Sequence, residues 1–158
     1  MNLNYKVLGE GEHLIILHGL MGMLDNWFGP SKRYSEKYKV WLLDARNHGK
    51  SPHSDVFTYE SMAEDVRLFM EENNLESAHV LGHSMGGKTA MKLAQNYPHL
   101  IDKMIVADIA PREYPVHHDR ILTGLEAVDF DKVGRRGEVN DVLKDYVSDE
   151  GIRNFLLK

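Results

Sequence analysis

The segment Gly82–Gly87, Gly-His-Ser-Met-Gly-Gly, constrains the fold of this chain more than any other part of it. It contains the pattern Gly-x-Ser-x-Gly, which is typical of a strained turn between a strand and a helix with the serine at its apex. The run Ser77–Leu81 before it predicts a short strand. After it, residues recur at the spacing of one helix face: Ala90, Leu93, Ala94 and Tyr97. Strand, sharp turn and helix are the context that the pattern requires, so we predict that Ser84 is a catalytic nucleophile.

An earlier loop predicts the second half of such a site. His13–Leu17 is typical of a strand buried on both faces of a parallel sheet, and it leads into the glycine-containing loop His18–Gly22. Attack by a serine on a carbonyl group places negative charge on the carbonyl oxygen, which fixed backbone N–H groups stabilise. We expect these donors to be the amides of Leu20 and Met85. Two histidines beside them are predicted to line the substrate pocket: His18 and His83.

These motifs resemble those of the α/β-hydrolases, and most closely those of the small cytoplasmic esterases and thioesterases in that superfamily. The residues that carry the resemblance are spread along most of the chain: His18–Leu20, Asp25–Trp27, Asp44–Ser51, Gly82–Gly87, Asp108–Pro111 and Gly151–Lys158. The resemblance implies an α/β fold with a mostly parallel sheet, flanking helices and a helical cap insertion that covers the active site. It also implies that the C-terminal strands of the family fold are missing from this chain.

The sequence alternates between strand and helix patterns as far as Pro111. Strands are expected at 4–8, 13–17, 39–43, 77–81 and 103–107, and helices near 26–35, after Thr58 and after Ser84. Such alternation predicts parallel strands joined by right-handed crossovers. Beyond Pro111, apolar residues at helical spacing predict three amphipathic helices with no strand between them. We therefore divide the chain into a hydrolase core at 1–111 and a helical region at 112–158, which the resemblance identifies as the cap.

The predicted nucleophile needs two partners, a histidine that takes its proton and a carboxylate that orients this histidine. In the α/β-hydrolases the acid follows the serine in the chain, and the histidine follows the acid. Asp108 ends the strand next after that of Ser84, at the carboxyl edge where such sites assemble. Its Asp-Ile-Ala-Pro context is similar to the esterase subgroup. We predict Asp108 as the acid, and a helix cap or a loop carboxylate bonded to backbone is the alternative.

The histidine of the family lies on a loop after the last strand, beyond the end of this chain. Among the nine histidines present, only His117 and His118 follow the predicted acid, and they remain the alternative partners of the serine. The apolar face of the last helix runs through Leu157 without a glycine or proline stop signal. We therefore expect this chain to be the N-terminal part of a longer protein that supplies the histidine.

Charge and composition argue against several classes of function. A net charge of −5 with no basic stripe argues against a nucleic-acid partner. Among the charged residues, Asp44 and Arg46 after the strand at 39–43 are most simply a structural ion pair. The chain has no cysteine, which excludes disulfide and thiolate chemistry. No apolar run reaches the length of a membrane span, so we expect a cytoplasmic protein without a membrane partner. The motifs of dinucleotide and zinc sites do not occur, so we expect neither a cofactor nor a metal.

The sequence therefore predicts a serine hydrolase that cleaves a small-molecule carboxylic ester or thioester through an acyl-enzyme on Ser84. Two alternatives stay open. One is a lyase or an acyltransferase on the same fold, and the other is a non-catalytic module that has lost the triad. Serine rather than aspartate at the turn argues against haloalkane and epoxide chemistry. The acyl specificity and the oligomeric state are left open.

Overall fold

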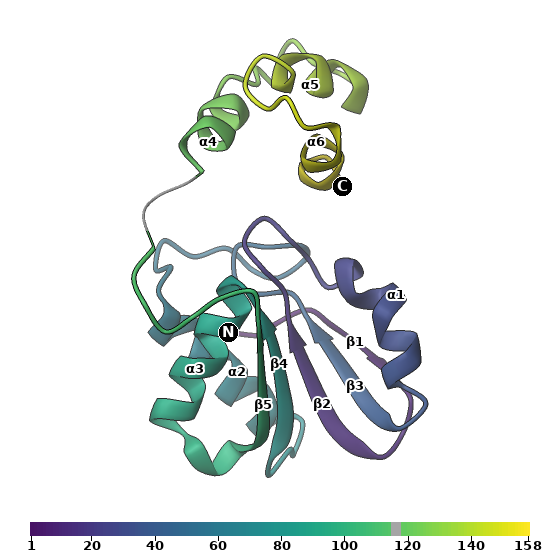
Figure 1. The fold of residues 1–158 in the computed structure, drawn as a ribbon, viewed down its shortest axis with the longest axis vertical. Helices are drawn as coiled ribbons and strands as arrows, with labels where there is room; N and C mark the ends of the chain where they lie inside the picture. The colour runs from purple at the N-terminus through teal and green to yellow at the C-terminus, as the bar shows by residue number, and fades with distance from the viewer. Residues whose placement is uncertain (115–117) are drawn as a thin grey trace. The chain divides into compact units, whose positions relative to one another are not determined.

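The computed structural model describes residues 1–114 and 118–158 of the chain. The chain forms two compact units, Met1–Pro111 and Arg112–Lys158 (Figure 1). The boundary between the units falls where the alternation of strands and helices ends. Among the described residues, no helix combines the length and the apolar character that crossing a membrane requires.

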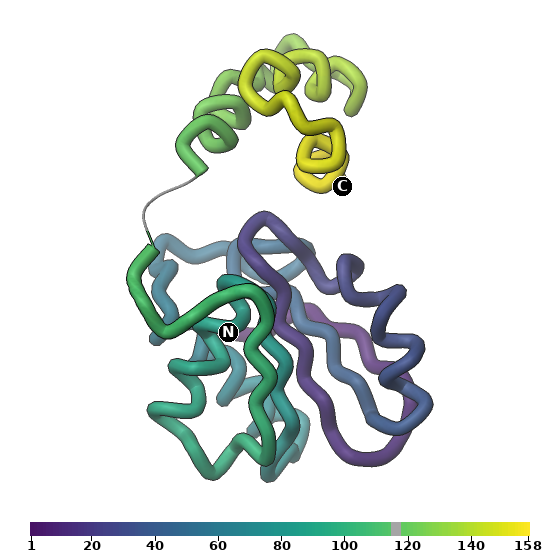
Figure 2. Tube along the Cα trace, in the orientation of Figure 1, coloured from purple at the N-terminus to yellow at the C-terminus, as the bar shows by residue number. Residues whose placement is uncertain are grey.

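A five-stranded sheet forms the centre of the first unit. Its strands are β1 (Tyr5–Leu8), β2 (Glu12–Leu17), β3 (Tyr38–Leu43), β4 (Ala78–His83) and β5 (Ile101–Ala107). They lie in the order β1-β3-β2-β4-β5. β1 runs antiparallel to β3 and the other neighbours are parallel, which confirms the predicted mostly parallel sheet. The carboxyl ends of the parallel strands therefore meet at one edge, and the loops after β2, β3 and β5 leave from it (Figure 2).

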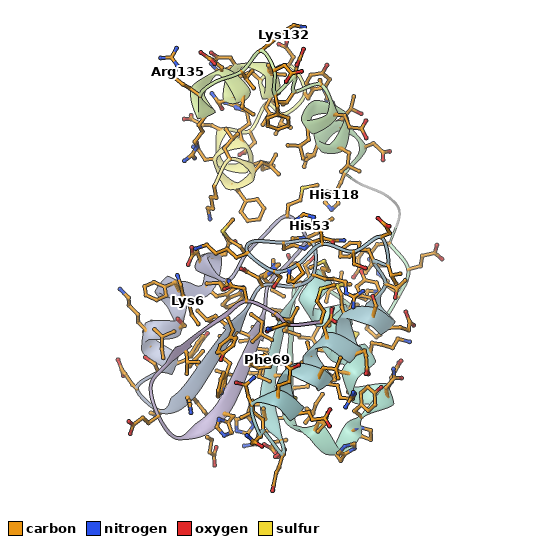
Figure 3. All side chains as sticks on the ribbon, turned by 180° about the vertical axis from the view of Figure 1, so that it is seen from behind. Lys6, His53, Phe69, His118, Lys132 and Arg135 are labelled. Atoms are coloured by element: carbon orange, nitrogen blue, oxygen red, sulfur yellow. The ribbon has the colours of Figure 1, made fainter. Side chains whose placement is uncertain are left out.

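Helices cover both faces of this sheet. They are α1 (Asp25–Tyr34), α2 (Tyr59–Glu72), α3 (Met85–Asn96) and the short η1 (Pro98–Leu100). Successive side chains of a strand point to opposite faces, so each central strand contributes to two apolar cores. In β2, Ile15 and Leu17 belong to the core under α2 and α3, which also contains Phe69 (Figure 3). Leu14 and Ile16 belong to the core on the other face, next to α1.

Helix α2 begins at the cap that its sequence predicts. The Thr58 hydroxyl accepts a hydrogen bond of 3.1 Å from the Ser61 amide, and the Thr58 amide donates to the Ser61 hydroxyl over 3.1 Å. This reciprocal pair satisfies N–H groups that the first turn of a helix leaves without an intrahelical partner.

The second unit consists of three helices, as its sequence predicts: α4 (Asp119–Glu126), α5 (Arg136–Leu143) and α6 (Glu150–Leu156). Leu143 and Val147 are buried at its centre. Helix α4 packs closely against this centre, because a Cβ on Gly124 would come within 2.8 Å of the Cβ of Tyr146. From α6, the buried side chain of Arg153 donates a hydrogen bond of 3.0 Å through its Nε to Oδ1 of Asn140 in α5. The helices are thus joined by both apolar and polar contacts.

The loop after β3 overturns one sequence prediction, the ion pair between Asp44 and Arg46. Arg46 instead pairs with Asp65 of α2, with its Nε 2.6 Å from Oδ2, and both side chains are buried. Asp44 accepts hydrogen bonds from the backbone amides of Leu24 and Lys50, at 2.7 and 2.9 Å. The prediction is wrong because each side chain has other partners within reach: Asp44 is taken up by backbone amides of the neighbouring loops, and Arg46 by the carboxylate of Asp65 on α2.

Candidate active site

Ser84 lies in the turn between β4 and α3, as its motif predicts. β4 ends at His83 and α3 begins at Met85, and Ser84 between them has a φ of 50° and a ψ of −113°. A residue with a side chain rarely adopts a positive φ, and such strain costs roughly 1–3 kcal/mol. Backbone hydrogen bonds hold the turn: the Ser84 amide donates to Ala107 over 3.0 Å, and the Ser84 carbonyl accepts from Gly87 over 2.9 Å.

The glycines around the serine allow two backbones to approach each other. A Cβ on Gly82 would overlap the backbone of Gly86, and a Cβ on Gly86 would overlap the carbonyl of Leu17 at the end of β2. Helix α3 therefore starts directly against β4 and β2. This close approach explains why the pattern has glycine on both sides of Ser84.

The loop from β2 to α1, residues 18–24 (the β2–α1 loop), passes directly beside the serine. A Cβ on Gly19 would lie 3.3 Å from the Cβ of Ser84 and 2.9 Å from Nδ1 of His83. The loop contains a turn that is closed by a hydrogen bond of 3.0 Å from the Gly22 amide to the Gly19 carbonyl. At position 19 the loop thus lies so close to the serine that a side chain there would require His83 to shift.

The amides of Leu20 and Met85 are available at this edge of the sheet. Met85 is the first residue of α3, where the N–H groups have no intrahelical acceptor and the helix dipole favours negative charge. Within residues 1–114 and 118–158, neither the Leu20 nor the Met85 amide donates a hydrogen bond to the protein. Groups of this kind can stabilise an oxygen on which negative charge develops.

His18 is buried beneath the β2–α1 loop, with an exposed fraction of 2%. Its Nε2 accepts a hydrogen bond of 3.0 Å from the amide of Ala45, so the ring proton is on Nδ1, which donates to the Gly19 carbonyl over 2.7 Å. Burial is the main cause that lowers the pKa of His18 to about 4. The ring is therefore neutral near pH 7 and holds the loop with both of its nitrogens.

His83 and Asp108 lie beside the serine on neighbouring strands. His83 pairs in register with Ala107, which places Asp108 next to Ser84 at the ends of β4 and β5. Nε2 of His83 is 3.8 Å from Oδ2 of Asp108, with side chains that are 41% and 88% exposed. A polar contact of this length between exposed side chains is weak. The His83 ring also packs against Trp27, with 6.3 Å between the ring centroids.

The structure therefore brings the predicted nucleophile, oxyanion donors and acid to one edge of the sheet. It shows no histidine base for the serine in the described parts of the chain, where no histidine forms a hydrogen bond to the Ser84 hydroxyl. His117, one of the two alternatives, lies outside the described residues, and His118 directly precedes α4 in the second unit. In the same described parts, no group of three or more His, Asp or Glu side chains is arranged to hold a metal ion.

One part of the site was missed by the sequence analysis, the loop from β3 to α2 at residues 44–58 (the β3–α2 loop). Asp44, Ala45 and His48 each form a hydrogen bond across to the β2–α1 loop. A signal for this contact exists in the sequence. These residues directly follow β3, and two parallel neighbouring strands bring the loops at their carboxyl ends together.

Comparisons with known proteins agree with this fold. Residues 12–132 match the sequence model of the alpha/beta hydrolase fold. The chain is 34% identical over 164 residues to Esterase YbfF of Escherichia coli (strain K12), covering 100% of this chain and 65% of that protein. It is 36% identical over 168 residues to the sn-1-specific diacylglycerol lipase ABHD11 of Danio rerio, covering 99% of this chain and 53% of that protein. The chain thus spans between about half and two thirds of these relatives.

A solved structure is also closely similar. The structure of a marine microorganism esterase superposes with a TM-score of 0.95 at 44% sequence identity, and the match covers 98% of this chain and 62% of that one. The strand order, the strained serine turn and the match of the family's sequence model over residues 12–132 agree with one another. The chain belongs to the α/β-hydrolase fold family.

Proposed function

We propose that the protein is a serine hydrolase that cleaves carboxylic esters or thioesters by way of an acyl-enzyme on Ser84. The observation that carries this proposal is the strained backbone of Ser84 beside the available amides of Leu20 and Met85. Strained non-glycine residues persist only where the surrounding structure holds them, and they cluster at functional sites. The names of Esterase YbfF and of the marine esterase support the same class of reaction.

The proposed acylation begins when Ser84 Oγ forms a bond to the acyl carbon and passes its proton to a histidine base. The electron pair of the carbonyl bond moves to the oxygen, which the amides of Leu20 and Met85 stabilise, each by roughly 3–4 kcal/mol. The tetrahedral intermediate then expels the alcohol or thiol, which takes the proton from the histidine. A water molecule attacks the acyl-enzyme in the same way, and the carboxylic acid and free Ser84 are released.

In this scheme Asp108 orients the histidine. Two observations support the assignment: the strand register places Asp108 next to Ser84, and its carboxylate is open to a partner at 88% exposure. The proposal takes the histidine from a part of the family fold outside this chain, since the relatives are longer. His83 would line the substrate pocket together with Trp27, and His18 would shape the loop that forms it.

The second unit, 112–158, is proposed to act as the cap of the family. Its exposed apolar side chains, Leu122, Phe130 and Ile152, permit a substrate with an apolar acyl group but do not fix the length of that group. The diacylglycerol lipase named among the relatives acts on a substrate of this kind. We further propose a cytoplasmic protein with a small-molecule substrate. The net charge of −5 disfavours a nucleic-acid partner.

Covalent labelling tests the nucleophile. The native protein is purified from its own cells, its intact mass is measured, and it is treated with a fluorophosphonate probe. Ser84→Ala is expected to abolish both labelling and ester hydrolysis. Ser148→Ala, which alters an exposed serine of the second unit, is the matched control and is expected to label like the unchanged protein. Unchanged labelling of Ser84→Ala would contradict the proposal.

Two further outcomes separate the alternatives. Labelling of Ser84 without ester turnover would favour a lyase or an acyltransferase. The 158-residue chain by itself is expected to hydrolyse esters at least ~10³-fold more slowly than a protein with a complete triad, because loss of the histidine has an effect of that size. Full turnover by this chain alone would instead support His117 or His118 as the base.

A further inference from the structure

The β2–α1 loop, which carries Leu20, is held from the side by the β3–α2 loop. One hydrogen bond of 3.0 Å joins the Ala45 amide to the ring of His18. A second, of 3.1 Å, joins the Met21 amide to Nε2 of His48. A third, of 2.7 Å, joins the Leu24 amide to the buried carboxylate of Asp44. The bonds are spread along the loop, at its beginning, middle and end.

The middle bond has a defined direction because the other nitrogen of His48 has a fixed partner. Nδ1 of His48 lies 2.9 Å from the carbonyl of Arg46, which can only accept, so Nδ1 carries the ring proton. Nε2 is then the acceptor for the Met21 amide. The ring is packed between other rings, with centroid distances of 5.1 Å to His18 and 5.9 Å to Phe57.

Met21 is the residue in this loop whose conformation needs support. It follows Leu20 in the turn that the Gly22 amide closes on the Gly19 carbonyl, and its φ is 60°. A positive φ at this third position of a turn is the mark of type II, which usually has glycine there. Turns of types I and II differ by a flip of the central peptide, here the one between Leu20 and Met21. An acceptor for the Met21 N–H selects one of the two orientations.

The Leu20 N–H belongs to the first peptide of this turn, the one between Gly19 and Leu20. The Gly19 carbonyl accepts from His18 Nδ1 over 2.7 Å and from the Gly22 amide over 3.0 Å. Because the peptide is trans and planar, the N–H of Leu20 points away from these two donors. The bond from Met21 to His48 holds the next peptide, so both peptides that flank Leu20 are fixed by hydrogen bonds.

We propose that His48 is a positioning residue for the oxyanion site: by accepting from the Met21 amide, it anchors the Gly19–Gly22 turn to the β3–α2 loop and so keeps Leu20, whose N–H lies in this turn, in place. This inference rests on the proposed function, because it assigns a purpose to the Leu20 amide. His48 touches no reacting atom and acts through Met21.

Two substitutions at one position separate the acceptor from the rest of the ring. His48→Gln can place an amide oxygen near the former Nε2, so it keeps the acceptor for Met21. His48→Asn reaches only the former Nδ1 position, so it keeps the donor to the Arg46 carbonyl and loses the acceptor. Thermal unfolding of both variants shows that they fold, and amide hydrogen exchange of Met21 is then followed in each.

We expect the Met21 amide to exchange at least ~10-fold faster in His48→Asn than in the unchanged chain, and to stay within about threefold in His48→Gln, because only His48→Asn removes the acceptor that protects this amide. In the native protein, kcat for ester hydrolysis should fall by about 10- to 100-fold in His48→Asn with KM nearly unchanged, because the loss arises in the transition state. His48→Gln should retain most of kcat.

Either of two results would overturn the inference. In one, His48→Asn has the same Met21 amide exchange rate and the same kcat as the unchanged protein. In the other, His48→Gln shows changes in exchange and kcat as large as those of His48→Asn. Failure of the proposed function is recognised separately, because hydrolysis would then be unaffected by Ser84→Ala. Exchange at Met21 needs no turnover, so it decides in that case whether His48 holds the turn.

Discussion

The β2–α1 loop and the end of β5 reach the same edge of the sheet, but they are held very differently. The loop is pinned by hydrogen bonds to Ala45, His48 and Asp44, and His18 beneath it is 2% exposed. Asp108, at the end of β5, is 88% exposed and faces His83 across 3.8 Å. One side of the candidate site is rigid, and the other is open.

This difference follows from what each side would do. N–H groups stabilise a developing oxyanion best when they are already in place, because no reorganisation is then needed during the reaction. A carboxylate that orients a histidine becomes fixed when the histidine packs on it. The rigid side is built entirely from residues of this chain, whereas the open side presents the exposed carboxylate of Asp108 to the proposed histidine.

The largest loss of stability on the rigid side is expected for Asp65→Ala. This change removes the partner of the buried Arg46 guanidinium and leaves a charge without compensation, which costs about 4 kcal/mol in the free energy of unfolding. Urea unfolding measures it. The control is Asp141→Ala, which breaks an exposed pair with Lys144 and should cost less than about 0.5 kcal/mol. Equal effects of the two changes would show that the β3–α2 loop is not anchored at Arg46.

A slightly smaller loss is expected when the pH falls. Burial lowers the pKa of His18 from 6.5 to about 4; His48 and His83 add to this shift, while the Gly19 carbonyl and Asp44 oppose it. The unfolded chain therefore takes up the proton first. The stability due to neutral His18 is complete above about pH 6.5 and declines down to about pH 4, by about 3 kcal/mol in total.

The contribution of His18 is isolated by comparing the unchanged protein with His18→Gln in urea unfolding at several pH values. Glutamine can accept from the Ala45 amide but does not titrate, so the variant should lose less stability between pH 6.5 and 4. If both proteins lose the same amount, the buried ring of His18 is not what makes the rigid side sensitive to acid.

Gly86→Ala should reduce stability by about 2 kcal/mol, because its Cβ would overlap the Leu17 carbonyl and push α3 away from the β2–α1 loop. Gly29→Ala is the matched control in α1, where an added Cβ meets nothing within 4 Å. It should raise stability by about 0.5–1 kcal/mol, since alanine is the better helix former. Thermal unfolding compares the two, and a stabilising Gly86→Ala would refute the close approach.

The parts of the structure that the sequence predicts well depend on local chemistry. Apolar alternation and length define β2, the hydroxyl of Thr58 defines the start of α2, and the glycines around Ser84 define the strained turn. Each of these features acts over a few residues. The pattern at residues that are neighbours in the chain is therefore enough to predict them.

The parts that the sequence does not predict depend on which strands are neighbours. Arg46 was assigned to Asp44, two residues away, and its partner is Asp65, which lies on a helix on one particular face of the sheet. The contact of His48 with Met21 requires that β3 pair with β2. The antiparallel pairing of β1 with β3 is likewise a matter of strand order. No local pattern carries this information.

The smallest effect on stability is expected on the open side, at Asp108. Its side chain is 88% exposed, and asparagine tolerates its φ of 57°, so Asp108→Asn should change the free energy of unfolding by less than about 0.5 kcal/mol. Hydrolysis by the native protein should nevertheless fall by about 10⁴-fold, because the histidine would lose the carboxylate that orients it. Asp102→Asn, on the exposed part of β5, should change neither quantity. A variant of Asp108 that keeps full activity would place the acid elsewhere, and one that unfolds would show that this side is not open.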